Sequence, residues 1–221
     1  EYCDKYIGGL IDGLKQRGLY DNSLIVFTAD HGEEFHEHGG WWHGLSLYDE
    51  QIGIPLLFKL PQNQLAGQAC GYLARHVDLG PTLLQFANAD PKEAVDAKMQ
   101  GEPLFAKENA AKFNDVSGGY IYSHLNFEGI ELRSVRTLLY KLIQSNENNK
   151  RHYAPVELYD IVTDPGERKN LAGAGDPEEP KLGDTLEAMR KYAAENAQKP
   201  EAASVSAEEQ VALDALGYGG K

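Results

Sequence analysis

The side chains best suited to chemistry gather in residues 28–44, a segment that reads TADHGEEFHEHGGWWHG. The segment holds four of the chain's seven histidines, four acidic residues and both tryptophans. Imidazole and carboxylate groups bind divalent cations and move protons near neutral pH, so the cluster suits metal-assisted or acid–base chemistry. Because loops with many titratable groups on rigid scaffolds are usually functional sites, this segment is the candidate site.

Asp30 and His31 are the candidate metal ligands, because they lie two residues beyond the apolar run SLIVF of residues 23–27. A carboxylate and an imidazole at the mouth of a buried strand can reach one cation, with magnesium, manganese or zinc among the choices. An isolated Asp-His pair would more often be a turn residue beside a surface histidine. The glycines and titratable groups that follow this pair favour a site.

His43 is the candidate catalytic acid, since an imidazole beside a metal-bound anion can protonate a leaving oxygen. The alternative is that His43 only packs beneath the neighbouring tryptophans. His36 is expected at the surface, and His38 could be either decoration or part of the site. Three glutamates could orient the histidines, although a solvated carboxylate is the simpler reading of each one: Glu33, Glu34 and Glu37.

Outside this segment the chemical signals are weaker. Asp78 is expected to cap a helix, and His76 beside it is ambiguous. His124 falls in an expected strand and is read as a core or edge residue, whereas His152 lies in a polar loop with no expected role.

The elements around the candidate site indicate an α/β fold. An apolar stripe predicts a first helix that ends before Gly18 and buries Cys3 in the core. Residues 23–28 read as a strand of the kind buried on both faces of a parallel sheet, with further strands expected over residues 52–59 and 71–77. Ligands of open α/β sheets bind beyond the carboxyl ends of strands, where the candidate site begins.

The pattern changes after about residue 106, where several short strands predict an antiparallel sheet. The chain is therefore expected to divide into residues 1–105 and residues 106–221. The strands are expected over residues 120–125, 130–135, 138–144 and 156–159, with helices over residues 79–87, 182–196 and 206–216.

Five segments together resemble the C-terminal half of a sulfatase of the alkaline phosphatase superfamily, and they occur in the family's order. The resemblance implies that residues 1–105 are part of a large mixed β-sheet flanked by helices. Residues 106–221 would then be a small antiparallel sheet with helices. The segments are GLYDNSLIVFTADHGEEFHEHGGWWHGLSLYDEQIGIPLL, HVDLGPTLLQFANA, MQGEPL, VELYDIVTDPGERKNLA and SAEEQVALDALGY.

The resemblance implies one divalent cation, usually calcium, with Asp30 and His31 among its ligands; magnesium and manganese are the alternatives. His43 is the nearest match to the family's Lys or His that contacts the sulfate or the leaving group. The family's nucleophile is a formylglycine made from a C/S-x-P-x-R motif. Neither Cys3, Cys70 nor any serine of this chain fits that motif.

The nucleophile and the other metal ligands are thus expected in an N-terminal half of the same protein, and this chain alone is expected to be inactive. The expected substrate is a sulfated small molecule or carbohydrate. Bacterial members of the family are often exported, which suggests a periplasmic or secreted protein.

The bulk composition narrows the remaining alternatives. A net charge of −13 disfavours nucleic acid and anionic membrane surfaces as partners, and every apolar run is too short to span a bilayer. Two alternatives stay open: a phosphodiesterase, phosphonate hydrolase or phosphotransferase of the same superfamily, and a non-catalytic binding module. The ELYD, DP and NL elements of the tail favour the sulfatase.

Overall fold

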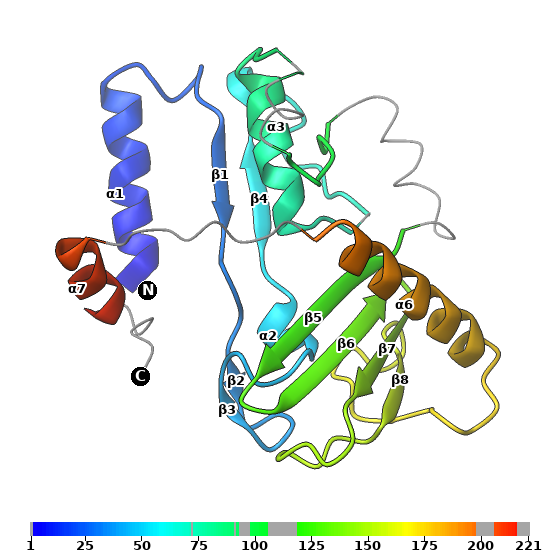
Figure 1. Ribbon diagram of the computed structural model, residues 1–221. Helices are drawn as coiled ribbons and strands as arrows, with labels where there is room; N and C mark the ends of the chain where they lie inside the picture. Colours follow the sequence, from blue (N-terminus) through cyan, green and yellow to red (C-terminus); the bar gives the residue numbers. More distant parts are fainter. Residues whose placement is uncertain are drawn as a thin grey trace. The chain divides into compact units, whose positions relative to one another are not determined.

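A computed structural model describes residues 2–71, 73–90, 92, 98–105, 119–197 and 206–215. The chain forms two compact units, Glu1–Glu187 and Ala188–Lys221, and the expected division at residue 105 stays a prediction. The elements of the first half are α1 (Tyr2–Gln16), β1 (Ile25–Thr28), β2 (Glu34–Phe35), β3 (Trp41–Trp42), α2 (Asp49–Ile52), β4 (Leu56–Lys59), the 3₁₀ turns η1 (Pro61–Asn63) and η2 (His76–Asp78), and α3 (Leu79–Phe86) (Figure 1). The second half contains β5 (Ile121–Phe127), β6 (Ile130–Arg136), β7 (Tyr140–Ser145), β8 (Val156–Asp160), α6 (Glu178–Glu195) and α7 (Ala207–Ala215).

The helix α1 forms where the apolar stripe predicts it, but none of its described residues is buried. Cys3 is exposed, so its assignment to the core is wrong within this chain. Tyr2, Tyr6 and Leu10 are likewise exposed. A periodic stripe shows that one face of a helix is apolar, and it does not show what covers that face. The helix ends at Gln16, before Gly18 as expected, and Gly18 has a φ of +67°.

The strands β1 and β4 lie side by side as an antiparallel pair, with Ile25 opposite Lys59 (Figure 1). Residues 23–28 are expected as a strand of the kind found in parallel sheets, and the pair observed here is antiparallel, which a mixed sheet allows. An apolar run indicates burial and carries no information on the direction of the neighbouring strand. Phe27 and Leu57 face each other in this pair and are 43% and 58% exposed, so one face of the pair presents apolar side chains.

The third expected strand, over residues 71–77, is also absent from the described residues of that segment. Instead η2 forms, and the buried carboxylate of Asp78 accepts hydrogen bonds from the backbone N–H groups of Arg75 (2.9 Å) and Glu102 (3.0 Å). Asp78 does occupy the N-cap position of α3, but its side chain makes no cap hydrogen bond there. These polar contacts hold the loop around residues 101–104 against η2 and α3.

The strands β5 to β8 form one twisted antiparallel sheet in sequence order, as expected (Figure 1). Side chains alternate between its two faces. Val135, Leu142 and Leu158 lie on one face and are all buried. The other face contributes to a buried cluster with the segment before α2, made up of Leu47, Tyr48, Ile130, Leu132, Ile143 and Tyr159.

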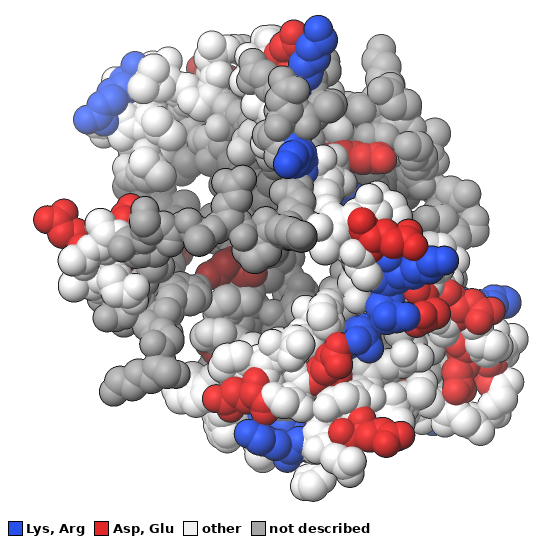
Figure 2. Space-filling model, viewed as in Figure 1, with Lys and Arg blue, Asp and Glu red and all other residues white. Residues whose placement is uncertain are grey.

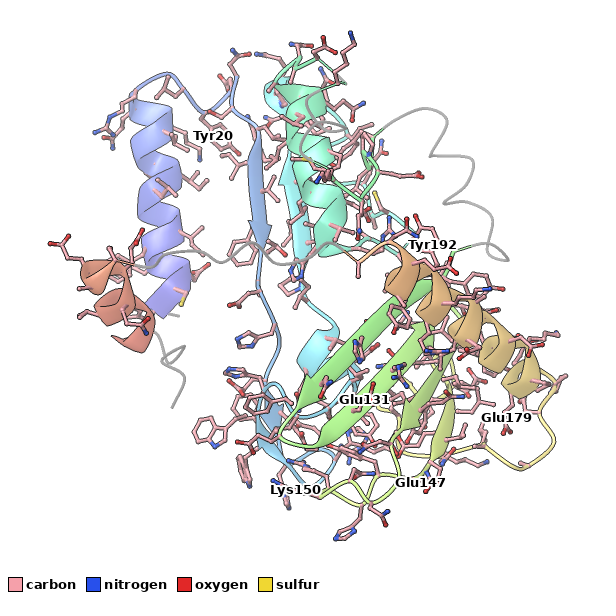
Figure 3. All side chains as sticks on the ribbon, viewed as in Figure 1. Tyr20, Glu131, Glu147, Lys150, Glu179 and Tyr192 are labelled. Carbon is pink, nitrogen blue, oxygen red and sulfur yellow. The ribbon has the colours of Figure 1, made fainter. Side chains whose placement is uncertain are left out.

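His124 lies on the edge strand β5, which confirms its reading as an edge residue. Its Nε2 is 3.5 Å from Oε1 of Glu131, a β6 residue labelled in Figure 3, and Glu131 also pairs with Arg133. The N-terminus of α7 is capped as its sequence indicates. The backbone N–H of Ser206 donates to the Glu209 carboxylate, and the backbone N–H of Glu209 donates to the Ser206 hydroxyl oxygen.

The buried face of the sheet gives a direct stability prediction. Leu158→Ala should lower the free energy of unfolding by about 2–5 kcal/mol, because Leu158 has no exposed surface and its truncation leaves a cavity. Leu139→Ala is the matched control, since Leu139 is 44% exposed. Urea unfolding of the whole protein measures both changes, and equal effects of the two variants would contradict the placement of this face.

Candidate functional site

The candidate site lies in residues 29–48, here called the site loop, which follows the carboxyl end of β1. Its first chemical pair is compact: the backbone N–H of His31 donates to Asp30 Oδ1 at 3.0 Å, and His31 Nε2 lies 3.7 Å from Asp30 Oδ2. His31 Nδ1 is 2.7 Å from the carbonyl oxygen of Gly32, which can only accept. The neutral ring therefore carries its proton on Nδ1, which leaves Nε2 unprotonated and free to bind a cation beside the Asp30 carboxylate.

This donor pair fits a divalent cation as part of its coordination shell. A carboxylate oxygen and an imidazole nitrogen suit calcium, magnesium, manganese or zinc, all of which need four or more ligands. Across the ranges that the structure describes, no three His, Cys, Asp or Glu side chains gather as a metal site. Asp30 and His31 can thus be two ligands of a larger site, and further donors are needed to complete it.

His43 lies against this pair. Its ring stacks on that of His31, with the centroids 3.8 Å apart and the planes 26° from parallel. Its Nδ1 is 3.2 Å from Glu33 Oε1 and 3.3 Å from Oε2. A carboxylate accepts and cannot donate, so Nδ1 carries a proton and the other nitrogen, Nε2, is left for a substrate. The structure therefore brings together all three candidate site residues, with Glu33 orienting one of them.

Glu34 is a buried structural residue, so the expectation that it is a solvated carboxylate is wrong. The side chain is fully buried and accepts from the backbone N–H groups of His38 (3.2 Å) and Gly40 (2.6 Å). It also accepts from Gln51 Nε2 at 2.8 Å. A Cβ atom at position 40 would lie 1.9 Å from an Arg151 guanidinium nitrogen and 2.5 Å from Glu34 Oε2, so any larger residue here would displace these two side chains. Glu34 fixes the β2–β3 hairpin from inside.

Gln51 on α2 holds both ends of the site loop, and sequence reasoning missed it because a lone glutamine forms no motif. Its Oε1 accepts from the backbone N–H groups of Leu45 and Ser46, each at 3.2 Å. Its main-chain oxygen accepts from Gly32 N at 2.8 Å. Gly32 lies so close to α2 that an added Cβ would be 2.1 Å from the Glu50 carbonyl oxygen. The Asp30–His31 pair and His43 are thus both placed relative to α2.

His38 is a structural residue of the site loop. Its Nδ1 lies 2.5 Å from Glu50 Oε1, its Nε2 lies 2.8 Å from the carbonyl oxygen of Glu167, and its ring stacks on Tyr48. Burial alone would lower the pKa of His38, but Glu50 and Glu167 outweigh that effect and raise it. Burial would raise the pKa of Glu50, yet its bond to His38 holds that pKa below the ordinary value.

A cluster of four charged residues, two of them buried and two partly exposed, connects α2 to the C-terminal sheet and is here called the α2 clamp. It consists of Asp49, Arg136, Lys141 and Glu167. Lys141 Nζ lies 2.9 Å from Asp49 Oδ1 and 2.8 Å from Glu167 Oε1, and Arg136 also pairs with Asp49 at 2.9 Å. Burial favours a raised pKa for Asp49, but Lys141 and Arg136 hold it below its usual range. Burial raises the pKa of Glu167.

The remaining histidines lie outside the chemical cluster. His76 Nε2 is 2.8 Å from the carbonyl oxygen of Ala29, so it fixes the residue just before Asp30. His36 stacks on Trp41 at the surface of the hairpin, as expected. His152 lies in a loop with a φ of +56°. On the face drawn in Figure 2 the described acidic and basic side chains are interspersed, with no basic patch suited to nucleic acid.

Comparison with known proteins gives a consistent result. Residues 1–89 match the family model described as Sulfatase. An N-acetylglucosamine-6-O-sulfatase of Bacteroides thetaiotaomicron is 29% identical over 174 residues, which cover 77% of this chain and 30% of that protein. A Delta 4,5-hexuronate-2-O-sulfatase of the same organism is 31% identical, over 76% of this chain and 34% of that protein. The chain thus spans about a third of the length of these curated relatives.

Solved structures agree with the sequence relatives. A structure described as a complex with its substrate D-glucosamine-2-N,6-O-disulfate superposes with a TM-score of 0.70 and 27% identity, over 88% of this chain and 39% of that one. A structure described as a 2-O GAG sulfatase gives a TM-score of 0.65 and 27% identity, over 90% of this chain and 43% of that one. The mixed α/β architecture is therefore that of sulfatase structures. No helix in the described ranges is long and apolar enough to cross a membrane.

The His38–Glu50 pair predicts a pH window of stability. Raising the folded-state pKa of His38 stabilises the fold below the ordinary value of 6.5, and this contribution is lost as the pH rises through the raised pKa. Lowering the pKa of Glu50 stabilises the fold above the ordinary value of 4.5, and this contribution is lost as the pH falls through the lowered pKa. His38→Gln should therefore destabilise the protein most between these two values.

Urea unfolding of wild type and His38→Gln across the pH range measures this window, with His152→Gln as the control. The difference between wild type and His38→Gln should shrink on both sides of the window. A difference that grows as the pH rises above 6.5 would contradict the protonated His38.

Proposed function

Since the chain belongs to the sulfatase family, we propose that it supplies part of the catalytic site of an enzyme that hydrolyses sulfate esters. The observation that carries this proposal is the convergence of Asp30, His31 and His43 at the carboxyl end of β1. Ligand sites of α/β sheets are found at such strand ends. By resemblance, Asp30 and His31 fall at the positions of the family's metal ligands, and His43 is the nearest match to the family's Lys or His that contacts the sulfate or the leaving group.

Asp30 and His31 would hold one divalent cation, for which calcium is the first choice and magnesium or manganese the alternatives. The orientation of His31 supports this role, because its bond to Gly32 leaves Nε2 as an acceptor beside the Asp30 carboxylate. When bound, the cation would neutralise negative charge on the sulfate oxygens. The side chain of Asp30 is 74% exposed, so its oxygens are accessible to an ion and to further ligands.

His43 would act as the general acid that protonates the leaving alcohol. Glu33 supports this role because it engages Nδ1 and leaves Nε2 as the nitrogen that would deliver the proton. The stack on His31 keeps the ring beside the cation ligands. A sulfate ester held by the cation would therefore have its bridging oxygen near a proton donor.

The attacking nucleophile would come from outside this chain, as a formylglycine in the rest of the protein. The exposed apolar surface supports such a division. Tyr6 and Leu10 of α1, with Phe27 and Leu57 of the β1–β4 pair, are exposed here and would be covered by the remainder of the catalytic domain. Such a surface is ordinarily buried in a folded domain. The exposed side chains are large and apolar, as the interior of a mixed sheet domain requires.

The substrate is proposed to be a sulfated carbohydrate. The relatives named above are sulfatases of N-acetylglucosamine 6-sulfate and of hexuronate 2-sulfate by their descriptions. The structure with a TM-score of 0.70 is described as holding a sulfated glucosamine. A whole protein that cleaved aryl phosphates faster than sulfates would instead place this chain in a phosphoryl-transfer branch of the superfamily.

Removing a proposed metal ligand should abolish cation binding by the whole protein. Loss of residues that merely orient ligands costs about 10–100-fold in affinity, so Asp30→Ala should weaken calcium binding by at least about 100-fold. Isothermal titration calorimetry measures the affinity, and His152→Ala should bind as tightly as wild type. Equal calcium affinities of Asp30→Ala and wild type would remove Asp30 from the site.

The general-acid role predicts a dependence on the leaving group. His43→Gln should slow hydrolysis of a sugar sulfate by roughly 10²–10⁴-fold, since an alkoxide is a poor leaving group without a proton. Hydrolysis of 4-nitrophenyl sulfate should fall far less, because nitrophenolate leaves unaided. His36→Gln is the control from the same loop and should retain both rates. Equal losses of His43→Gln on the two substrates would argue against proton donation.

A further inference from the structure

The α2 clamp connects the C-terminal sheet to α2, which in turn holds the site loop. No sequence pattern indicates that connection. We propose that Lys141 and Glu167 are positioning residues, which hold α2 so that α2 in turn holds His43 in its reactive position. The inference rests on the proposed function for the role of His43. It adds a task for the C-terminal sheet, namely to set the geometry of a site to which the sheet contributes no reacting group.

The first step is the charge balance of the clamp. Lys141 has no exposed side-chain surface and Glu167 has 1%. With Arg136 and Asp49 the clamp holds two positive and two negative charges, all within 2.9 Å of a partner. Removing Lys141 alone would leave Glu167 buried without a partner, and removing Glu167 alone would leave the clamp with one excess positive charge, both of which are strongly unfavourable. The arrangement of the four side chains in which every charge is paired is therefore much lower in free energy than the alternatives.

The second step is that Glu167 contacts two parts of the site loop region at once. Its Oε2 accepts from the backbone N–H of Asp49 at 2.5 Å, at the first residue of α2. Its carbonyl oxygen lies 2.8 Å from His38 Nε2 and accepts a hydrogen bond from that nitrogen. A single residue of the Asp164–Asn170 turn thus fixes both α2 and the midpoint of the site loop.

The third step is the transfer of position from α2 to His43. Gln51 of α2 binds the N–H groups of Leu45 and Ser46, and through Glu34 it also holds the N–H of Gly40. His43 lies between these anchored residues. Its own side chain is 46% exposed, so its position depends on the anchored backbone on either side.

A small displacement would matter for chemistry. Misplacing a reacting group by about 1 Å can cost on the order of 10²-fold in rate, because the proton must travel along a narrow path. A merely structural clamp would instead lower stability and leave the rate of the folded enzyme unchanged. The two roles are separable by experiment, since only positioning acts through His43.

The first experiment is amide hydrogen exchange of the whole protein carrying Glu167→Gln, which keeps the size of the side chain and removes its charge. The amides of Gly40, Leu45 and Ser46 should exchange at least about tenfold faster, while those of β6 and β7 keep their protection. Asn170→Ala is the matched control. Asn170 holds the same turn to β8, because its side chain bonds the Leu158 N–H at 3.0 Å and the Val156 carbonyl oxygen at 3.2 Å, and its hydrogen bonds in the described residues do not reach α2.

The outcomes of the exchange experiment are decisive. Selective loss of protection in the site loop supports the positioning role. Unchanged loop amides, or a uniform acceleration that includes β6 and β7, would overturn it. If Glu167→Gln does not fold, the charge-balanced pair Lys141→Met with Glu167→Leu replaces it and carries the same expectation, because Arg136 and Asp49 still neutralise each other.

The second experiment is a double-mutant cycle on sugar sulfate hydrolysis. Glu167→Gln alone should lower kcat by roughly 10- to 100-fold with little change in KM. In a His43→Gln background the same change should cost less than about twofold, because the group being positioned is already gone. Full additivity of the two losses would overturn the proposal. Asn170→Ala should give the same small effect in both backgrounds.

Failure of the proposed function would look different from failure of this inference. A wild-type protein that hydrolyses no sulfate ester would refute the proposed function, while the exchange pattern would still decide whether the clamp holds the site loop. If the protein hydrolyses sulfate esters and Glu167→Gln leaves the exchange rates of the site-loop amides unchanged, the proposed function stands and the positioning role of the α2 clamp is refuted.

Discussion

The burial of one ammonium group, that of Lys141, is the constraint on which most of this structure depends. An ammonium group without exposed surface must be neutralised, and here Asp49 Oδ1 accepts a hydrogen bond from it at 2.9 Å while Glu167 Oε1 lies 2.8 Å away as a second negative partner. These two partners lie 118 residues apart in the sequence. Satisfying one charge therefore brings α2, the C-terminal sheet and the Asp164–Asn170 turn to a common point. The site loop inherits its position from that point through hydrogen bonds to α2.

Much of the architecture could be predicted from the sequence because it rests on local periodicity. The strands β5 to β8 and the helices α1, α3, α6 and α7 follow from alternating or helical apolar patterns and their caps. The errors share a cause. Cys3 and the residues of β1 were assigned from apolarity alone, which identifies a face but neither its cover nor the direction of the next strand. The strand prediction for residues 71–77 is wrong because the carboxylate of Asp78 binds the backbone N–H groups of Arg75 and Glu102, which favours a 3₁₀ turn there.

The candidate site residues could be named from the sequence because they lie close together along the chain. Asp30, His31 and His43 lie within fourteen residues of each other, and the structure stacks the two imidazoles. The supporting residues were not predictable in this way. Gln51 acts through backbone groups on both sides of the loop, and Glu167 acts across more than a hundred residues of sequence. Such roles arise from tertiary contacts, which a single sequence does not display. Glu34 was misread for the same reason.

The central claim is that Asp30 and His31 form half of a cation site beside a proton donor. The most direct measurement is a crystal structure of the whole protein with its cation and a sulfated sugar. The account predicts an Asp30 carboxylate oxygen at about 2.3–2.6 Å from a bound calcium ion, with His31 Nε2 facing the same ion. It also predicts His43 Nε2 at hydrogen-bond distance from the ester's bridging oxygen. A cation bound elsewhere, with Asp30 and His31 turned away from it, would contradict the account.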